Sequence, residues 1–329
     1  MSRSKNENET MSLRLINDDD ANLYQLDKKL GSGGYGTVYR VIDRRTGEKL
    51  ACKVQKVETD HQAGMRGREL VVWLEASRGT QHVARLRDAS YNRETKLLFV
   101  YMDLLRGGDL YDFTYGILDK KDRHNIVHPF LVFHLACEVA FGLNEIHAKG
   151  IMHRDLKLDN VLLTHKLTPR MNTALCRLSC GEMLDTKDEK NIQELFDIVF
   201  RKSDRDDPLA LLTDFGLSRN LNDENLRSNY TVVGMKPKWT KGISAPELVH
   251  HNHQSLMADI YSFGVLVYFY GHELQNLVHS CLNHDPLQRP DSEELIQKLW
   301  PLRIAAANRV KYHLKNLSNY KQHLQQIIE

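Results

Sequence analysis

Hydrophobic and polar positions change their period about a third of the way along the chain. Over residues 26–57, short apolar runs separated by turn residues predict three β-strands, and two more strands are expected around 83–91 and 96–102. Between these two groups, residues 66–75 have the period of an amphipathic helix. Its predicted inner face carries Leu70, Trp73 and Leu74. The first part of the chain is therefore expected to form a small β-rich unit with a helix.

After the turn at 106–108 the pattern becomes helical. Residues 130–147 have apolar side chains at helical spacing and predict a core helix, and 189–202 and 304–328 have the same period. We therefore expect an α+β fold of two lobes, with a ligand-binding cleft between them. The predicted segments are a disordered tail (1–22), a β-rich N-terminal lobe (23–105), a helical C-terminal lobe (106–300) with an insertion at about 164–208, and a helical extension (301–329).

Composition narrows the class of protein without deciding it. Of the 329 residues, 41% are hydrophobic and 27% are charged, which is typical of a folded globular chain. Lys and Arg (45) nearly balance Asp and Glu (43), so the charge gives no reason to expect nucleic acid as a partner. The polar N-terminus and the lack of a long apolar run predict neither a secretory signal nor a membrane span. Five scattered cysteines indicate reduced thiols and predict a cytoplasmic location. If the protein is a secreted effector or a viral protein, that cytoplasm is the host cell's.

Candidate chemistry begins with a glycine-rich segment. Residues 31–38 read G-x-G-x-x-G-x-V between two predicted strands, a pattern that lets a backbone approach phosphates closely. Taken alone, it fits an ordinary glycine-rich hairpin equally well. Lys53 follows on the next strand, and Glu69 on the predicted helix is its expected ion-pair partner, with Glu75 as the alternative.

Two further motifs decide the interpretation. Residues 153–160 read His-Arg-Asp-Leu-Lys-Leu-Asp-Asn, and residues 214–216 read Asp-Phe-Gly. Together with the glycine-rich segment and Lys53, they resemble the eukaryotic protein kinase family. The resemblance continues through Ala-Pro-Glu at 245–247, the segment 259–264 and the segment 284–290, and it covers about residues 24–300.

The resemblance implies a role for each motif residue. Asp155 would orient the acceptor hydroxyl or accept its proton, and Lys157 would neutralise the transferring phosphoryl group, in the pattern of Ser/Thr kinases. Asn160 and Asp214 would hold two Mg²⁺ ions. ATP would be contacted by Gly31, Ser32, Gly33, Gly34, Tyr35, Gly36, Val38, Ala51, Lys53, Met102, Asp103, Leu105, Asp109 and Leu162. A buried ion pair between Glu247 and Arg289 is also implied.

Three departures from the family pattern are visible. Residues 161–213 separate Asn160 from Asp214, where the family needs roughly a dozen, so about 40 residues are inserted. The helix expected at 189–202 either packs on the large lobe, the favoured interpretation, or docks an activating partner. The segment 234–243 is longer than in the family. In the family a threonine here binds the catalytic Asp and Lys, and Thr240, or else Ser244, is the candidate for that role. Residues 265–288 are too few for the usual helices, a pruning that resembles bacterial effector and viral kinases.

The predicted function is an autophosphorylating Ser/Thr protein kinase with a protein substrate. Arg154 marks the kinases whose activation loop is ordered by a phosphate, and Ser228, Tyr230 and Thr231 are candidate acceptors. A pseudokinase or nucleotide-binding scaffold is the alternative, although Lys53 and the aspartates 155 and 214 are all present. A small-molecule phosphotransferase ranks third. Cys176 and Cys180 lie close together, but two cysteines alone do not predict a metal site.

Overall fold

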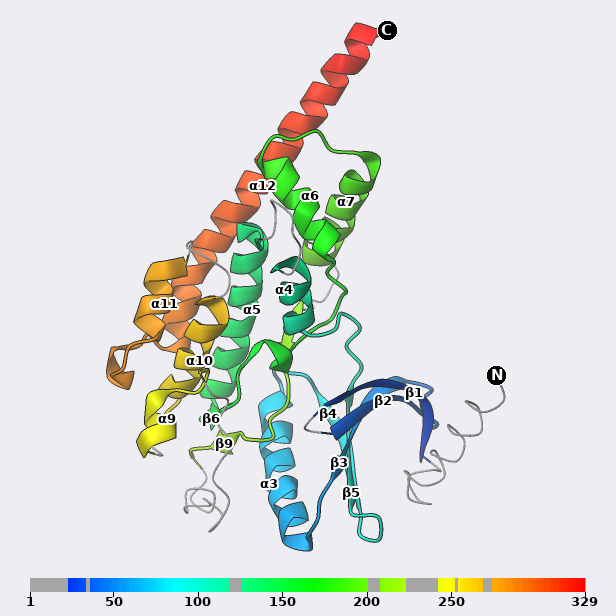
Figure 1. Ribbon diagram of the computed structural model, residues 1–329, viewed down its shortest axis with the longest axis vertical. Coiled ribbons are helices and arrows are strands. Elements are labelled where there is room, and N and C mark those ends of the chain that lie inside the picture. Colours follow the sequence, from blue (N-terminus) through cyan, green and yellow to red (C-terminus); the bar gives the residue numbers. More distant parts are fainter. Residues whose placement is uncertain are drawn as a thin grey trace. The chain divides into compact units, whose positions relative to one another are not determined.

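A computed structural model describes residues 23–33, 36–118, 126–200, 208–222, 242–251, 254–268 and 274–328. The chain forms two compact units (Figure 1). The first comprises Met1–Gly79 and Ala84–Leu105, and the second comprises Thr80–Val83 and Arg106–Glu329. The tail predicted at 1–22 lies outside the described residues.

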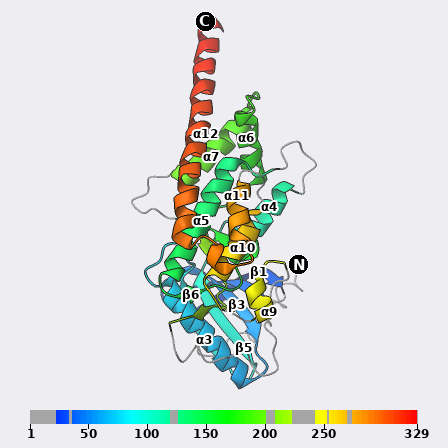
Figure 2. The ribbon, with the colours of Figure 1, turned by 90° about the vertical axis from the view of Figure 1, so that its left-hand side faces the viewer.

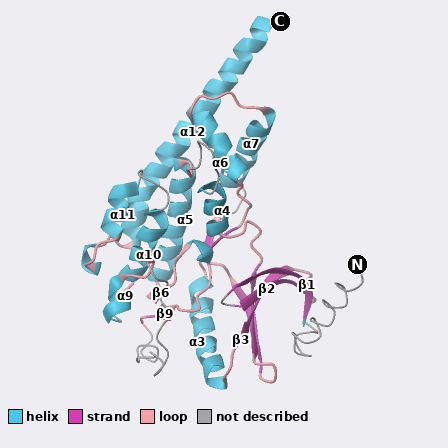
Figure 3. Cartoon of the chain, viewed as in Figure 1, coloured by secondary structure: helices cyan, strands magenta, loops and turns pink. Residues whose placement is uncertain are grey.

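The first unit is built on a five-stranded antiparallel sheet (Figure 3). Its strands lie in the order β1-β2-β3-β5-β4. They are β1 (Tyr24–Gly33), β2 (Gly36–Asp43), β3 (Lys49–Lys56), β4 (Leu86–Asn92) and β5 (Leu97–Asp103). All five strands were expected from the alternating pattern. The ring of Tyr24 on β1 stacks on that of Tyr101 on β5, with centroids 3.9 Å apart. Side chains of both strands therefore belong to one hydrophobic cluster.

Helix α3 (Asp60–Ser77) starts earlier than the periodicity predicted. Thr59 caps its N-terminus by accepting a hydrogen bond from the backbone N–H of Gln62, which satisfies a donor that the helix leaves open. Trp73 is buried and its Nε1 donates to the carbonyl of Ala84 at 2.8 Å. Leu74, expected on the inner face, is 45% exposed, because the residue after Trp73 points about 100° around the helix.

The second unit is mainly helical and is organised around α5 (Pro129–His147), as the apolar period predicted. The long helix α12 (Ser292–Ile328) runs along α5 (Figures 1 and 2). The predicted boundary at 300/301 falls inside α12, so the C-terminal extension continues a helix of the lobe. The remaining elements are α4 (Leu110–Leu118), β6 (Ile151–Met152), a 3₁₀ turn (Leu158–Asn160), β7 (Val161–Leu163), α6 (Pro169–Ser179), α7 (Thr186–Phe200), β8 (Ala210–Leu212), β9 (Arg219–Asn220), α9 (Pro246–His251), α10 (Met257–Tyr268), α11 (Gln275–Cys281) and a 3₁₀ turn (Pro286–Gln288).

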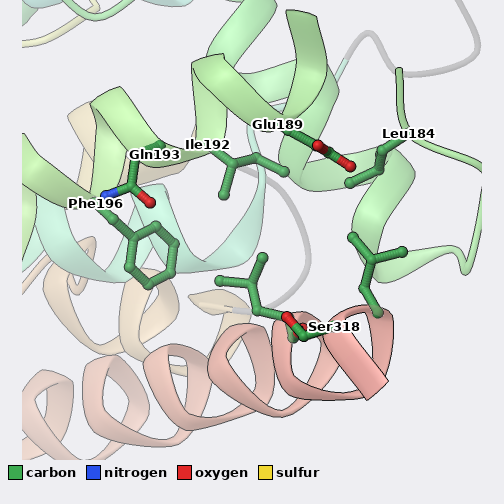
Figure 4. Close-up of a pocket in the computed structure, with 8 residues that line it drawn as sticks. Leu184, Glu189, Ile192, Gln193, Phe196 and Ser318 are labelled. Carbon is green, nitrogen blue, oxygen red and sulfur yellow. The ribbon is translucent and has the colours of Figure 1, made fainter. Parts of the chain in front are cut away.

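In the described part of the insertion between β7 and β8 there are two helices, α6 and α7, of which only α7 was expected. Ile192 and Leu195 of α7 are buried, and the rings of Phe196 and Phe200 lie 6.3 and 5.6 Å from that of Phe130 on α5. Leu184 and α7 also face the distal part of α12 across a cavity of about 380 Å³ (Figure 4). Helix α7 therefore packs on the rest of the second unit, and docking of an activating partner on the insertion stays a prediction.

The two cysteines of the insertion differ in their surroundings. Cys176 is buried and Cys180 is exposed, and no disulfide joins them. Within the described ranges, no cluster of three His, Cys, Asp or Glu residues is arranged to hold a metal ion. One described helix, α5, is long and apolar enough to cross a bilayer, and 78% of its apolar window is buried inside the protein, as in an ordinary core helix.

The shortened segment after α10 brings α10 and α11 into close contact. A Cβ atom at Gly264 would lie 2.6 Å from Cβ of Cys281 and 3.1 Å from Leu282, so a larger residue would force the helices apart. The two helices thus pack almost backbone to backbone.

A buried histidine begins helix α5. The backbone N–H of Phe130 donates to Nδ1 of His128, so Nε2 carries the proton and donates to Oγ of Ser179 at 2.9 Å. Burial, together with the positive charges of His313 and Arg309 on α12, lowers the pKa of His128 from 6.5 to about 4. The folded protein therefore holds this imidazole neutral over a pH range in which the unfolded chain protonates it.

This histidine predicts an acid-dependent loss of stability. As the pH falls from 6.5 towards 4, the unfolded state binds a proton that the folded state does not, which costs roughly 3 kcal/mol of unfolding free energy in total. His128→Asn keeps a capping side chain but does not titrate. We expect urea unfolding, followed by circular dichroism, to show a flatter dependence of the unfolding free energy on pH in this variant. Equal slopes in the two proteins would contradict the assignment.

Candidate active site

The loop that joins β6 to β7 is fixed by a fully buried carboxylate on α10. Asp259 accepts hydrogen bonds from the backbone N–H groups of His153 and Arg154 at 2.7 and 2.8 Å, and from Nε2 of His147 at 3.0 Å. Arg154 has φ +69°, a conformation that side chains disfavour and that these bonds hold in place. Burial alone would raise the pKa of Asp259, but the hydrogen bond and charge of His147 outweigh it and leave that pKa lowered.

Within this loop, three predicted site residues lie in direct contact. Oδ2 of the buried Asp155 accepts a hydrogen bond from Nζ of Lys157 at 2.9 Å and from Nδ2 of Asn160 at 3.0 Å. Nδ2 of Asn160 also donates to the carbonyl of Asp155 at 2.7 Å. The backbone N–H of Asp155 donates to Nδ1 of His153 at 3.3 Å. The arrangement presents a pre-positioned carboxylate beside a fixed positive charge.

The two predicted metal ligands are held by the pairing of β7 with β8. The backbone N–H of Thr213 donates to the carbonyl of Asn160 at 3.0 Å, and Nε2 of His153 donates to the carbonyl of Thr213 at 2.9 Å. Asp214 follows with φ +60°. Because Nδ2 of Asn160 donates to Asp155, its Oδ1 is left as an acceptor. An amide oxygen and a carboxylate are oxygen donors of the kind Mg²⁺ prefers, so these residues fit the metal.

The first unit contains the glycine-rich segment and the strand lysine. Lys53 on β3 lies opposite Val38 on β2, and Gly33 pairs with Gly36. Gly36 has φ +122°, and a Cβ there would lie 2.3 Å from the carbonyl oxygen of Val54, so only glycine fits. Residues 34 and 35 lie outside the described ranges.

Glu69, the expected partner of Lys53, lies on α3 in the same unit. It forms an ion pair with Arg66, with Nη1 2.7 Å from Oε2. The Lys53–Glu69 pair, and the preference for Glu69 over Glu75, stay predictions.

The predicted hinge residues lie at the end of β5 and just beyond it. Met102 pairs with Ala51, and the backbone N–H of Asp103 donates to the carbonyl of Arg85 at 3.2 Å. The carboxylate of Asp103 binds Nε of Arg87 at 2.5 Å, and Nη2 of Arg87 binds Glu48 at 2.6 Å. The sequence reasoning missed this network because it joins residues far apart along the chain.

Asp109, predicted near the ribose, begins α4 in the second unit. Its Oδ1 accepts a hydrogen bond from the backbone N–H of Asp112 at 2.7 Å, and its backbone forms a bridge with Leu162. Burial raises the pKa of the Asp109 carboxyl. The aspartate is thus half-buried at a helix start, next to another residue predicted to contact ATP.

The predicted site residues are therefore shared between the two units. The first unit contains Gly31, Ser32, Gly33, Gly36, Val38, Ala51, Lys53, Glu69, Met102, Asp103 and Leu105, and the second contains Asp109, Asp155, Lys157, Asn160, Leu162 and Asp214. The candidate acceptors at 228, 230 and 231, and Thr240, lie outside the described residues. Ser244 is described and lies just before α9.

Comparison with known families agrees with this geometry. A model of the protein kinase domain matches residues 24–270, which is most of the chain. The chain belongs to the protein kinase family. The match covers the glycine-rich segment, the catalytic loop and the Asp-Phe-Gly motif, so the kinase resemblance and the α+β fold are confirmed.

Relatives of this kinase come from distant organisms. It is 24% identical to calcium-dependent protein kinase 5 of Plasmodium berghei, over 93% of the chain and 50% of the relative. It is 28% identical to the Ser/Thr-protein kinase PkaA of Streptomyces coelicolor (82% and 44%), and 25% identical to cAMP-dependent protein kinase type 3 of Saccharomyces cerevisiae (84% and 58%). The chain spans about half the length of these curated relatives.

The C-terminal part of the kinase domain contains the expected buried ion pair. Nη1 and Nη2 of Arg289 bind the two carboxylate oxygens of Glu247 at 2.6 and 2.9 Å. The same guanidinium donates to the carbonyls of Met257 and Asn283, both at 2.8 Å, and lies 5.0 Å from the ring centroid of Tyr261. Four hydrogen bonds from the guanidinium thus surround the buried charge, as a stable buried pair requires.

Proposed function

We propose that this chain is an active serine/threonine protein kinase that transfers the γ-phosphoryl group of ATP to protein hydroxyls. The observation that carries the proposal is the buried Asp155 carboxylate, held between the ammonium group of Lys157 and the amide of Asn160. Phosphoryl transfer requires mainly positioning and charge neutralisation, and this arrangement supplies both.

In the proposed reaction, Asp155 orients the acceptor hydroxyl and accepts its proton as the hydroxyl oxygen bonds to the γ-phosphorus and the bond from that phosphorus to ADP breaks. Lys157 offsets the negative charge on the transferring group. Mg²⁺ would supply positive charge that offsets the charge of the phosphates. Asn160 and Asp214 are proposed to hold the metal, at two positions.

The first unit is proposed to supply the remaining contacts of the nucleotide. Lys53 binds the α- and β-phosphates, and Glu69 orients it. The glycine-rich segment 31–36 covers the phosphates. The hinge at 102–105 contacts the adenine, with Val38, Ala51 and Leu162 against its ring and Asp109 near the ribose.

Preference for serine and threonine is supported by Lys157, two places after the catalytic aspartate, and by the names of the relatives. Autophosphorylation at Ser228, Tyr230 or Thr231, a protein that activates the kinase through the insertion, and a cytoplasmic location are part of the same proposal. The scaffold alternative gains no support. Pseudokinases typically lack the strand lysine or one of the two aspartates, and Lys53, Asp155 and Asp214 are all present here.

The test is transfer of labelled γ-phosphate from ATP and Mg²⁺ to the protein itself and to generic basic proteins, followed by phosphoamino-acid analysis. Phosphoserine or phosphothreonine is expected. Bound ATP without transfer would favour either a kinase that requires an activating partner or the scaffold alternative. Phosphotyrosine alone would refute the preference for serine and threonine. A phosphopeptide map without 228, 230 and 231 would refute the proposed autophosphorylation sites.

A further inference from the structure

The insertion creates a positioning problem at the start of β8. Strands β7 and β8 have three residues each, and residues 164–209 intervene between them. A tight turn would fix the register of such a short pair of strands, whereas a long connecting segment does not. Asp214 follows β8 by two residues, so any displacement of this strand also displaces the proposed metal ligand.

Hydrogen bonds from outside the strand pair hold both ends of β8. At its start, Oε2 of Glu138 on α5 accepts from the backbone N–H of Leu209 at 2.8 Å and from that of Ala210 at 3.5 Å. At its end, the N–H of Leu212 donates to the carbonyl of His82 at 2.8 Å. Glu138 and His82 therefore bracket the strand.

The two bracketing residues also contact each other. Nε2 of His82 lies 3.8 Å from Oε2 of Glu138, and Nε2 of His134 lies 3.8 Å from the other carboxylate oxygen. Nδ1 of His82 is bound to Glu145, 3.0 Å away, which also accepts from the N–H of His82. The carboxylate of Glu138 is 6% exposed, so its position is fixed from several sides.

Helix α5 approaches the bracket closely at Gly142. A Cβ atom there would lie 2.9 Å from Cγ of Leu212 and 3.1 Å from the carbonyl oxygen of His82. Glu138, Gly142 and Glu145 stand four and three residues apart, so they share one face of α5. This face of α5 therefore lies against β8 and against His82, which binds the end of the strand.

We propose that Glu138 is a positioning residue that ties the return of the insertion to α5 and thereby sets the position of Asp214. The expected effect on metal binding rests on the proposed kinase function. The path runs from Glu138 to Leu209, along β8, and through Thr213, whose N–H and carbonyl are held by Asn160 and His153. Glu138 itself touches neither metal nor nucleotide.

The test compares two substitutions at this position. Glu138→Leu removes the acceptor for the N–H of Leu209, whereas Glu138→Gln retains an acceptor oxygen without the charge. Affinity for Mn²⁺ in the presence of a non-hydrolysable ATP analogue is measured by electron paramagnetic resonance. We expect Glu138→Leu to weaken Mn²⁺ binding by about tenfold, and Glu138→Gln to stay close to the wild type.

A control separates positioning from general instability. Leu295→Ala opens a cavity under a fully buried side chain at the start of α12. Amide hydrogen exchange over 209–216 is measured in all four proteins. Faster exchange in Glu138→Leu than in Leu295→Ala, together with weaker Mn²⁺ binding, is expected; identical behaviour of these two variants would overturn the proposal. If the wild type binds no Mn²⁺–nucleotide, the proposed function fails, and hydrogen exchange still decides whether Glu138 holds β8.

Discussion

For the proposed kinase, Asp155→Asn is expected to lower the turnover number for phosphoryl transfer by about a thousandfold, while the KM for ATP should change little. Asparagine fills the same space and can still bind Lys157 through its amide oxygen, so the loop is expected to keep its conformation. It cannot accept the proton of the acceptor hydroxyl. The loss therefore reports on the role of the carboxylate in the transition state rather than on nucleotide binding.

Steady-state transfer to a generic protein substrate, with ATP and protein varied separately, measures this effect. Asp159→Asn is the matched control, because it removes an exposed carboxylate from the same loop. The control should keep wild-type turnover. If Asp155→Asn also kept it, proton acceptance by Asp155 would be ruled out.

Arg289→Met destabilises the protein by about 3–5 kcal/mol. The substitution leaves the Glu247 carboxylate buried without its partner and deprives the carbonyls of Met257 and Asn283 of a donor. An unpaired buried charge is more costly than the loss of the whole pair. Urea unfolding monitored by tryptophan fluorescence measures the change.

Removal of both charges separates the cost of an unpaired buried Glu247 from the cost of losing the ion pair itself. The double variant Glu247→Leu, Arg289→Met should recover part of the stability that Arg289→Met loses, because no buried charge remains alone. Arg170→Met, at an exposed position on α6, serves as the control and should change stability very little. Equal losses for the arginine variants at 289 and 170 would contradict the buried-pair account.

The catalytic loop could be predicted from sequence because its chemistry is local. Asp155, Lys157 and Asn160 lie within six consecutive residues, so one contiguous motif carries the family resemblance that implies their roles, and the structure adds the hydrogen bonds between them. The Glu247–Arg289 pair joins distant residues, yet it was predicted as well, since the family resemblance carried information that the residues alone do not hold.

The support of β8 could not be predicted in the same way. Glu138 and His82 occupy positions that would suit exposed polar residues equally well, and only the fold brings them to the two ends of one strand. Helix α6 was missed for a related reason, because its fully buried Asn172 interrupts the apolar pattern. That side chain is satisfied by the backbone N–H of His128 and the carbonyl of Ile126, contacts that no local periodicity reveals.

The contact between Thr164 and Leu209 has a practical use. The N–H of Thr164 donates to the carbonyl of Leu209 at 2.9 Å, so the two ends of the insertion are neighbours in the ladder. A two-residue Asn-Gly hairpin turn is long enough to join them directly. A shortened protein lacking 165–208 would uncover Phe130 on α5, which the rings of Phe196 and Phe200 now approach. Phe130 would then be the first position to redesign as polar for a minimal, soluble version of the domain.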